Sequence, residues 1–487
     1  MSPKPPLHAA ALAHWDGGRL DLALVDAWAF YAAAPDAVDA KALLADLLHA
    51  GPQFALPSQR AGLLGLVRDP SVNPASVARA GWHAAQTDPA FDAAELPALA
   101  AIVARDDLVQ ALLEETPVTT LAVEHRLTAL RRWLLLGGHA ADFPRAVQAL
   151  VRQAGHNGGA WLFDEQERAC LAAASGTPLA GAYIVPRLAA ATGGGFADST
   201  TVAVADQYER WPYPQWSRVT RRAPTPLAAV IRRVDPEGPD TIPANPSILV
   251  AGCGTGREIA LLAARHPESR ITAIDLSSHS LGYAGDRLAQ AGWHGIELIR
   301  MDLHAVAALG RRFDYISCSG VLHHLPDPEA GWAALAGVLE PGGVMHIMVY
   351  SRIARLRVQA MRRSFADLLD RSLDDDLLRE ARRRTMEKGA MRSLASVDFF
   401  TLAGVHDLLL HRHEDPFDVP RIGRALDALG LELLGFDLPN RARRASYRAA
   451  HPHDLHFRDR SAWAALERSN PTLFAGMYGF WCRKPIR

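Results

Sequence analysis

Short apolar runs recur along residues 246–487 and alternate with stretches of helical periodicity. Such a run is typical of a strand that is buried on both faces of a parallel sheet. The runs predict strands at residues 248–250, 270–275, 296–303, 313–319, 344–350, 431–438 and 476–484. Because strands alternate with helices, the pattern predicts an α/β fold with a mainly parallel sheet.

The first part of the chain has helical periodicity and predicts an all-α domain, with helices at residues 39–50, 108–115, 120–136 and 142–154. Its start resembles the second half of a tetratricopeptide unit. Small residues at Ala23 and Ala27 permit close helix packing, Phe30 fills the next turn and Pro35 ends the helix. No clean second copy follows at the repeat period, so a degenerate repeat and an ordinary helical bundle both fit.

A glycine-rich turn follows the first strand, with Gly252, Gly254 and Gly256 spaced as G-x-G-x-G. Glycine allows a tight turn and the close approach of a ligand to the backbone. The helix predicted at 258–265 offers free N–H groups at its N-terminus. The turn therefore predicts a site for a nucleotide-like cofactor, and a ligand-free strand–turn–helix corner is the alternative. The spacing is one residue shorter than the dinucleotide fingerprint.

Two further strands end in acids. Asp275 ends the second strand, about twenty residues after the loop, where a ribose hydroxyl would need an acceptor. Asp302 ends the third strand, and the fourth runs into the pair His323 and His324. Together with Leu339–Gly343, these elements resemble the class I S-adenosylmethionine-dependent methyltransferases from about residue 200 to the C-terminus.

This resemblance implies a Rossmann-like seven-stranded sheet with an antiparallel last strand, which separates the family from nicotinamide-binding folds. It also implies S-adenosyl-L-methionine as cofactor. The glycines would border its methionine part, Asp275 would hold the ribose hydroxyls, and Asp302 and Leu303 would face the adenine. The residues expected at the cofactor are Gly252, Cys253, Gly254, Gly256, Glu258, Asp275, Leu276, Asp302, Leu303, Ser319 and Tyr208.

One position departs from the family pattern. Many relatives carry an acid two residues before the first glycine, where this chain has Val250. That acid usually helps to hold the ammonium group of the cofactor. Glu258, on the first turn of the following helix, is the candidate replacement, although an acid at a helix N-terminus is also favourable by itself.

An aromatic segment precedes the fold, from Tyr208 to Trp216. It resembles the Tyr-Glu-x-x-Pro-Tyr-Pro-x-Trp element of a bacterial methyltransferase group that has helical, often tetratricopeptide-like, N-terminal regions. Two prolines stiffen the segment, and the aromatic rings supply large apolar area. We expect this aromatic strap either to close over the cofactor or line the acceptor pocket, or to pack between domains.

The expected layout is an all-α domain at 1–195, the strap and lead-in at 196–245 and the methyltransferase domain at 246–487. The glycines at 193–195 predict the first boundary. A helical lid insertion is expected at about 352–418, over the active site. Its arginine-rich helical stretch also carries many acids, which predicts a solvated face with ion pairs and argues against a nucleic-acid surface.

Methyl transfer needs in-line positioning of the acceptor, and a base only if the acceptor is protonated. His324 and His413 are the candidate catalytic bases, with His323 and His411 beside them, because imidazole titrates near neutral pH. A structural role also fits the pair at 323–324. The spacing of His411, His413 and Glu414 is too loose to favour a metal site, so no metal is expected.

Composition bears on the partners of the protein and on its cellular compartment. A formal net charge of −1 gives no global attraction to nucleic acid or to an anionic membrane. The four cysteines lack metal-site spacing, which predicts free thiols in a reducing compartment. The sequence shows neither a signal peptide nor a membrane span, so we expect a cytoplasmic protein.

The sequence thus predicts an S-adenosylmethionine-dependent methyltransferase whose acceptor is a protein, a peptide or a small molecule. The helical domain favours a protein or peptide, because repeats build extended binding surfaces. One alternative is a catalytically degenerate methyltransferase fold that recruits a partner through its helical domain. A nicotinamide-dependent oxidoreductase is disfavoured by the glycine spacing. Neither the methylated atom nor the oligomeric state is predicted.

Overall fold

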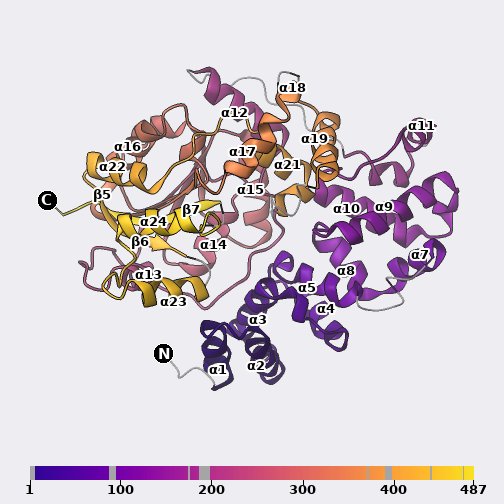
Figure 1. Ribbon diagram of the computed structural model, residues 1–487, viewed down its shortest axis with the longest axis horizontal. Coiled ribbons are helices and arrows are strands. Elements are labelled where there is room, and N and C mark those ends of the chain that lie inside the picture. The colour runs from indigo at the N-terminus through magenta and orange to yellow at the C-terminus, as the bar shows by residue number, and fades with distance from the viewer. Residues whose placement is uncertain are drawn as a thin grey trace. The chain divides into compact units, whose positions relative to one another are not determined.

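The computed structural model describes residues 6–86, 91, 95–173, 176–185, 198–369, 371, 373–389, 397–438, 441–474 and 476–486 (Figure 1). The predicted boundary at residue 195 lies outside these ranges. The chain forms two compact units. The helical unit comprises residues 1–188, 217–221 and 362–410, and the sheet unit comprises residues 189–216, 222–361 and 411–487.

The sheet unit contains a seven-stranded sheet in the order β3-β2-β1-β4-β5-β7-β6. Its strands are β1 (Ser247–Ala251), β2 (Arg270–Asp275), β3 (Glu297–Arg300), β4 (Phe313–Ser319), β5 (Leu339–Tyr350), β6 (Glu432–Asp437) and β7 (Met477–Arg483). Strand β7 runs antiparallel to both of its neighbours, and the pairs among β1 to β5 are parallel. The predicted α/β fold, a Rossmann-like seven-stranded sheet with an antiparallel last strand, is confirmed.

The two faces of the sheet differ. On one face, strand residues such as Ile316 and Phe480 form a buried core with α16 (Pro328–Gly337), α22 (Val419–Leu429) and α24 (Arg460–Ser469). Side chains alternate across a strand, so the neighbouring residues point to the opposite face. There the central strands carry polar groups, among them Ser317 and His346. We call this opposite face the polar face.

Further helices of the sheet unit are α12 (Ser199–Arg210), α13 (Leu227–Val234), α14 (Arg257–Arg265), α15 (Ser278–Gln290), α17 (Leu356–Arg363) and α23 (Arg441–Ala450). Helix α17 begins here and ends in the helical unit, because the units divide after residue 361. Helix α14 contacts the polar face through Glu258, which accepts a hydrogen bond from Ser317 of β4. The helix therefore follows the glycine turn and returns along the sheet, as the strand–turn–helix pattern predicts.

The helical unit is built around one buried apolar core. Its helices include α1 (Pro6–Asp16), α2 (Leu20–Ala33), α3 (Val38–Ala50), α4 (Arg60–Arg68), α5 (Pro74–Gln86), α7 (Leu96–Arg105), α8 (Asp107–Glu115), α9 (Leu121–Leu136), α10 (Pro144–Asn157), α11 (Glu165–Ala173), α18 (Ala366–Leu369), α19 (Asp375–Glu387) and α21 (Leu402–Leu409). Ala23, Ala27 and Phe30 are buried, as expected for close packing of α2. The tetratricopeptide-like repeat stays a prediction.

The segment predicted as a lid insertion differs from the prediction in its grouping. Residues 362–410 belong to the helical unit and not to the sheet unit. The physical reason is Arg382 of α19, whose fully buried guanidinium binds both carboxylate oxygens of Glu124 on α9, at 2.7 and 2.6 Å. Arg382 also donates to the carbonyl of Phe399 at 3.0 Å. The arginine-rich stretch, predicted to be helical, contains the three helices α17, α18 and α19.

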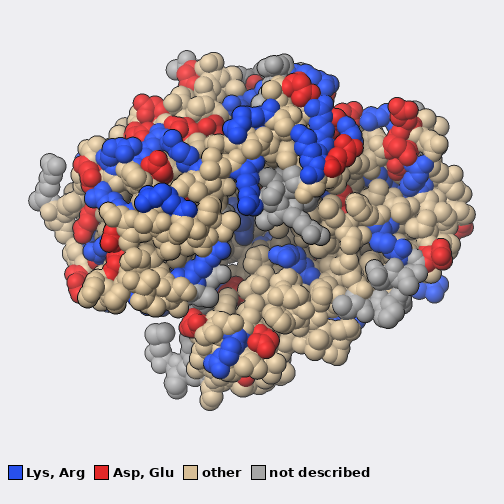
Figure 2. Space-filling model, in the orientation of Figure 1, with Lys and Arg blue, Asp and Glu red and all other residues tan. Residues whose placement is uncertain are grey.

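The neighbours of Arg382 on α19 behave as the charge pattern predicts. Arg383 pairs with Glu380 and Glu387, and Arg384 pairs with Glu380 and Asp367. Basic and acidic side chains are likewise interspersed on the face drawn in Figure 2. The arginine cluster is therefore mainly an ion-pair network.

Two smaller predictions concern thiols and membranes. All four cysteines are free, and Cys253, Cys318 and Cys482 are buried. Among the described residues, no helix combines the length and the apolar character that a membrane crossing requires.

Candidate functional site

The glycine turn after β1 has the backbone geometry that its sequence predicts. Gly252, Gly254 and Gly256 have φ values of 67°, 51° and 84°, in the left-handed region that favours glycine. The N–H groups of Gly252 and Cys253 both donate to the carbonyl of Ile274 at 2.9 Å, which ties the turn to β2. A Cβ atom on Gly252 would overlap the side chain of Val321. The turn thus has no room for a larger residue at its first position.

Asp275, at the end of β2, lies against this turn. Its carboxylate accepts hydrogen bonds from the N–H groups of Gly254 at 2.7 Å and Ser277 at 2.9 Å. Burial raises the pKa of Asp275, and these N–H groups act in the opposite direction. Each carboxylate oxygen has a second acceptor site. The arrangement therefore fits an acid that also accepts hydroxyl groups of a ligand.

Asp302 follows the neighbouring strand, β3. Its Oδ1 accepts from the N–H of His304 at 2.9 Å and caps the short 3-10 helix that begins at Leu303. Leu303 itself is buried, and the N–H of Met301 donates to the carbonyl of Asp275 at 2.9 Å. Parallel strands β2 and β3 thus bring the two acids to the same edge of the sheet, as predicted.

Glu258 lies close to Val250, the strand position at which many relatives carry an acid. Its Oε1 accepts from the hydroxyl of Ser317 at 3.0 Å. Ser317 pairs with Val250 in the sheet, so the acid of α14 reaches the strand position beside the missing acid. Ser319, two residues further along β4, donates to Sδ of Met348 at 3.2 Å. Sequence reasoning identified Glu258 but not Ser317, because the register between β1 and β4 was needed.

The aromatic strap is fixed to the glycine turn. The indole N–H of Trp216 donates to the carbonyl of Thr255 at 2.8 Å, and the hydroxyl of Thr255 binds the carbonyl of Pro214. The hydroxyl of Tyr283 on α15 donates to the carbonyl of Trp216 at 2.6 Å. These bonds show that the strap packs within the sheet unit.

Glu209, just before the prolines of the strap, caps helix α15. Its carboxylate accepts from the N–H groups of Ser278 at 2.7 Å and His279 at 2.9 Å. Burial alone would raise the pKa of Glu209, yet these N–H groups hold it below its usual value. An acid at a helix N-terminus is stabilising. The strap and α15 therefore support each other beside Asp275.

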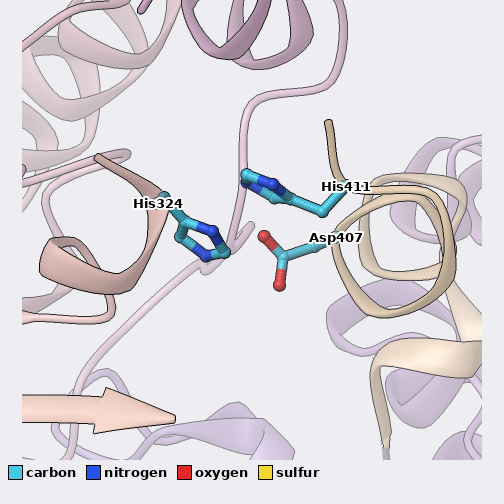
Figure 3. Close-up of side chains that lie close together, drawn as sticks. All are labelled: His324, Asp407 and His411. Atoms are coloured by element: carbon cyan, nitrogen blue, oxygen red, sulfur yellow. The ribbon is translucent and has the colours of Figure 1, made fainter. Parts of the chain in front are cut away.

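The predicted histidines lie together beyond β4. His324 donates from Nδ1 to the carbonyl of His413 at 2.8 Å and stacks on His411, with ring centroids 3.6 Å apart and planes 17° apart (Figure 3). The N–H of His413 donates to Nδ1 of His411 at 3.1 Å. Nε2 of His411 lies 3.2 Å from the hydroxyl of Tyr208 on α12. Because Nδ1 of His324 is a donor, the neutral ring carries its lone pair on Nε2.

His323 has a different environment from His324. Its ring is fully buried, which lowers its pKa well below the usual value; His324 and Arg355 act in the same direction. Its Nδ1 accepts from the N–H of Tyr350 at 3.2 Å. A neutral ring that accepts a backbone N–H serves to hold the end of β5, which supports the structural alternative for His323.

Arg355 and Glu414 form a buried ion pair near these histidines. Arg355 donates from Nε and a terminal nitrogen to the two oxygens of Glu414, both at 2.7 Å, and its guanidinium lies 4.0 Å from the ring centroid of Tyr350. Glu414 is therefore engaged by an arginine. No local sequence pattern pointed to Arg355, because its partner lies in a distant segment.

Comparison with known proteins finds methyltransferases that are similar to the region from β1 to β5. Residues 249–345 match the family model of a methyltransferase domain. The chain is 32% identical over 269 residues to an uncharacterized protein of Synechococcus sp., covering 49% of this chain and 60% of that protein. It is 33% identical over 110 residues to a ubiquinone biosynthesis O-methyltransferase of Azoarcus sp., covering 22% of this chain and 46% of that protein.

The chain thus spans less than two thirds of the length of these curated relatives. Among solved structures, PKMT2 from Rickettsia typhi in complex with AdoHcy matches with a TM-score of 0.37 and 16% identity, covering 49% of each chain. The family match coincides with β1 to β5 and with the glycine turn. Residues 249–345 therefore resemble a methyltransferase domain.

Proposed function

We propose that this protein is an S-adenosyl-L-methionine-dependent methyltransferase that acts on a protein, a peptide or a small molecule. The match of residues 249–345 to a methyltransferase domain carries this proposal. The glycine turn, whose three glycines have positive φ, supports it. So does the position of Asp275 and Asp302 at neighbouring strand ends. When bound, the cofactor supplies an activated methyl group on its sulfonium.

The cofactor-binding residues are assigned by the resemblance to methyltransferases, and the geometry of the turn and of the strand ends supports them. The turn at 252–256 borders the methionine part, with Cys253 in the turn and Ser319 at the end of β4. Asp275 accepts the ribose hydroxyls, with Leu276 next to it. Asp302 and Leu303 face the adenine, and Tyr208 reaches the site from the strap. Glu258, beside Val250, accepts the ammonium group.

Calorimetric titration tests the proposal and separates two of these roles. We expect S-adenosylhomocysteine to bind in the micromolar range, and the substitution Glu258→Gln to weaken its binding about tenfold, through loss of one charge-assisted contact. 5′-Methylthioadenosine lacks the amino-acid part, so its affinity should not change in Glu258→Gln. Asp275→Asn should weaken both ligands, because both contain the ribose.

The outcomes are distinct. An intact protein that binds neither ligand contradicts the proposed function. Equal losses for both ligands in Glu258→Gln would remove the ammonium role and leave the cofactor assignment in place.

For the acceptor side, we propose His324 as the general base and His413 as the second candidate. The lone pair on Nε2 of His324 follows from the hydrogen bond that Nδ1 donates to the carbonyl of His413. The side chain of His413 does not take part in that bond. Its Nε2 is buried without a hydrogen-bond partner among the described residues. Changing the His413 ring therefore leaves this bond in place, whereas changing the His324 ring removes its donor.

We expect His324→Gln to lower methyl transfer to a protonated acceptor at least about a hundredfold, because general-base catalysis contributes on this order. The affinity for S-adenosylhomocysteine should stay the same. The measurement is turnover with labelled donor and an acceptor found by screening, with exposed His453→Gln as control. Full activity in His324→Gln together with a large loss in His413→Gln would transfer the role to His413.

A further inference from the structure

A second polar cluster lies on the polar face, on strands β5, β7 and β6, away from β2 and β3 that carry Asp275 and precede Asp302. Oδ2 of Asp437 on β6 accepts hydrogen bonds from Nε2 of His346 on β5 and from the indole N–H of Trp481 on β7, both at 2.9 Å. The rings of His346 and Trp481 lie 4.5 Å apart. The Asp437 side chain remains 42% exposed. Two ring N–H donors thus orient a carboxylate that is still open to solvent.

The sheet register places this carboxylate in line with the end of β4. Asp437 pairs with Gly479, Gly479 with Met348, and Met348 with Ser319. The side chains of Ser319 and Met348 meet on the polar face, since the serine hydroxyl donates to the methionine sulfur. These four paired residues, Ser319, Met348, Gly479 and Asp437, form a row across the sheet. Three strand spacings of about 4.8 Å put Asp437 roughly 14 Å from Ser319 along this row.

Gly479 has no side chain, so no atom projects from the polar face between Met348 and Asp437. A Cβ atom there would lie 3.3 Å from Cβ of Asp437 and 3.6 Å from Nε2 of His346. The carboxylate of Asp437 therefore leans across β7 towards β5. The row from Ser319 to Asp437 consists of a hydroxyl, a thioether, a bare backbone and an acid, which suits an apolar chain that ends in a cation.

The charge of Asp437 is available for a ligand. Burial would raise its pKa, but the hydrogen bond and charge of His346 hold it below the usual value, with smaller contributions from Trp481 and Arg444. Within the described part of the chain, its ion pair is with His346 alone. The cofactor contacts proposed above do not use this carboxylate. Trp481 adds a ring face that attracts cations.

We propose that Asp437, oriented by His346 and Trp481, anchors a cationic group of the methyl acceptor, an ammonium or a guanidinium. This inference rests on the proposed function. The methylated atom lies near Ser319 and the cation about three strand spacings away. The acceptor is therefore an extended molecule or side chain that carries a positive charge at a distance from the atom that receives the methyl group.

A binding experiment tests this anchor without a known acceptor. The probe is 1,5-diaminopentane, titrated into the full-length protein saturated with S-adenosylhomocysteine, with the uncharged 1,5-pentanediol as its matched control. We expect the diamine to bind and the diol to bind at least about tenfold more weakly. Asp437→Asn should weaken the diamine about tenfold, which corresponds to one charge contact. Trp481→Phe, which keeps the carboxylate, should cause a smaller loss.

The matched control variant is Asp427→Asn, which removes an exposed acid of α22 that pairs with Arg460. It should leave diamine binding unchanged. Thermal unfolding and S-adenosylhomocysteine affinity verify that Asp437→Asn is folded. Unchanged diamine binding in a folded Asp437→Asn, or no diamine binding by the intact protein, would overturn the inference. An intact protein that does not bind S-adenosylhomocysteine would contradict the proposed function itself, and the inference with it.

Discussion

Replacing Arg382 with methionine is expected to destabilise the helical unit by about 3–5 kcal/mol, because the change leaves the carboxylate of Glu124 buried without its partner. Both side chains of this ion pair are almost fully buried, at 0% and 4% exposure. Methionine matches the length of the arginine stem but supplies no charge. Urea or thermal unfolding of the full-length protein measures the effect.

Arg384→Met is the matched control, two residues along the same helix. Arg384 pairs with Glu380 and Asp367 at the surface, where solvent screens the interaction, so its loss should change stability little. Similar unfolding midpoints for the two variants would show that the buried pair does not hold α19 in the helical unit. The double variant Arg382→Met with Glu124→Leu should recover much of the loss, since it removes both charges.

The second large effect is expected at the glycine turn. Gly252→Ala should weaken S-adenosylhomocysteine about a hundredfold, which corresponds to roughly 2.7 kcal/mol. Alanine is strained at a φ of 67°, and its Cβ would overlap Val321. The turn would have to move away from the position in which it borders the ligand. Calorimetry with both proteins gives the ratio of affinities.

Two companion variants separate the causes. Gly282→Ala, in the middle of α15, adds a Cβ that meets no atom within 4 Å and should leave binding unchanged. Adding Val321→Ala to Gly252→Ala removes the overlap but keeps the strained φ, so it should restore affinity only in part. Wild-type affinity in Gly252→Ala would show that the turn does not border the cofactor.

Much of the sheet unit was predictable from local pattern. The predicted strand 270–275 matches β2, and the predicted helix 258–265 differs from α14 by one residue at its start, because apolar runs and glycine turns are read from neighbouring residues. The glycine turn and Asp275 were predictable for the same reason: spacing along the chain determines both. The strap was recognised as a segment, whereas its bonds to Thr255 and Tyr283 could be seen only in the folded chain.

The residues that escaped prediction depend on distant partners. Arg382 looks in sequence like its neighbours Arg383 and Arg384, and only the position of Glu124 on α9 makes it a buried residue. Ser317 could be placed beside Val250 only once the register between β1 and β4 was known. His346, Asp437 and Trp481 come from three strands that the chain visits far apart. Local periodicity contains no information about such pairs, because it describes one element at a time.

The grouping of residues 362–410 with the helical unit has a consequence for synthesis and for dissection of the protein. Each unit is assembled from three separate stretches of chain. A fragment that ends near residue 195 lacks Arg382 and the whole of α19, so Glu124 would lose the partner that it has in the full chain. On the ribosome, the helical unit cannot form the buried ion pair between Glu124 and Arg382 until α19 has emerged, after β1 to β5 have been made. The two units are therefore interleaved in the gene, and neither can be moved, deleted or recombined as one uninterrupted segment.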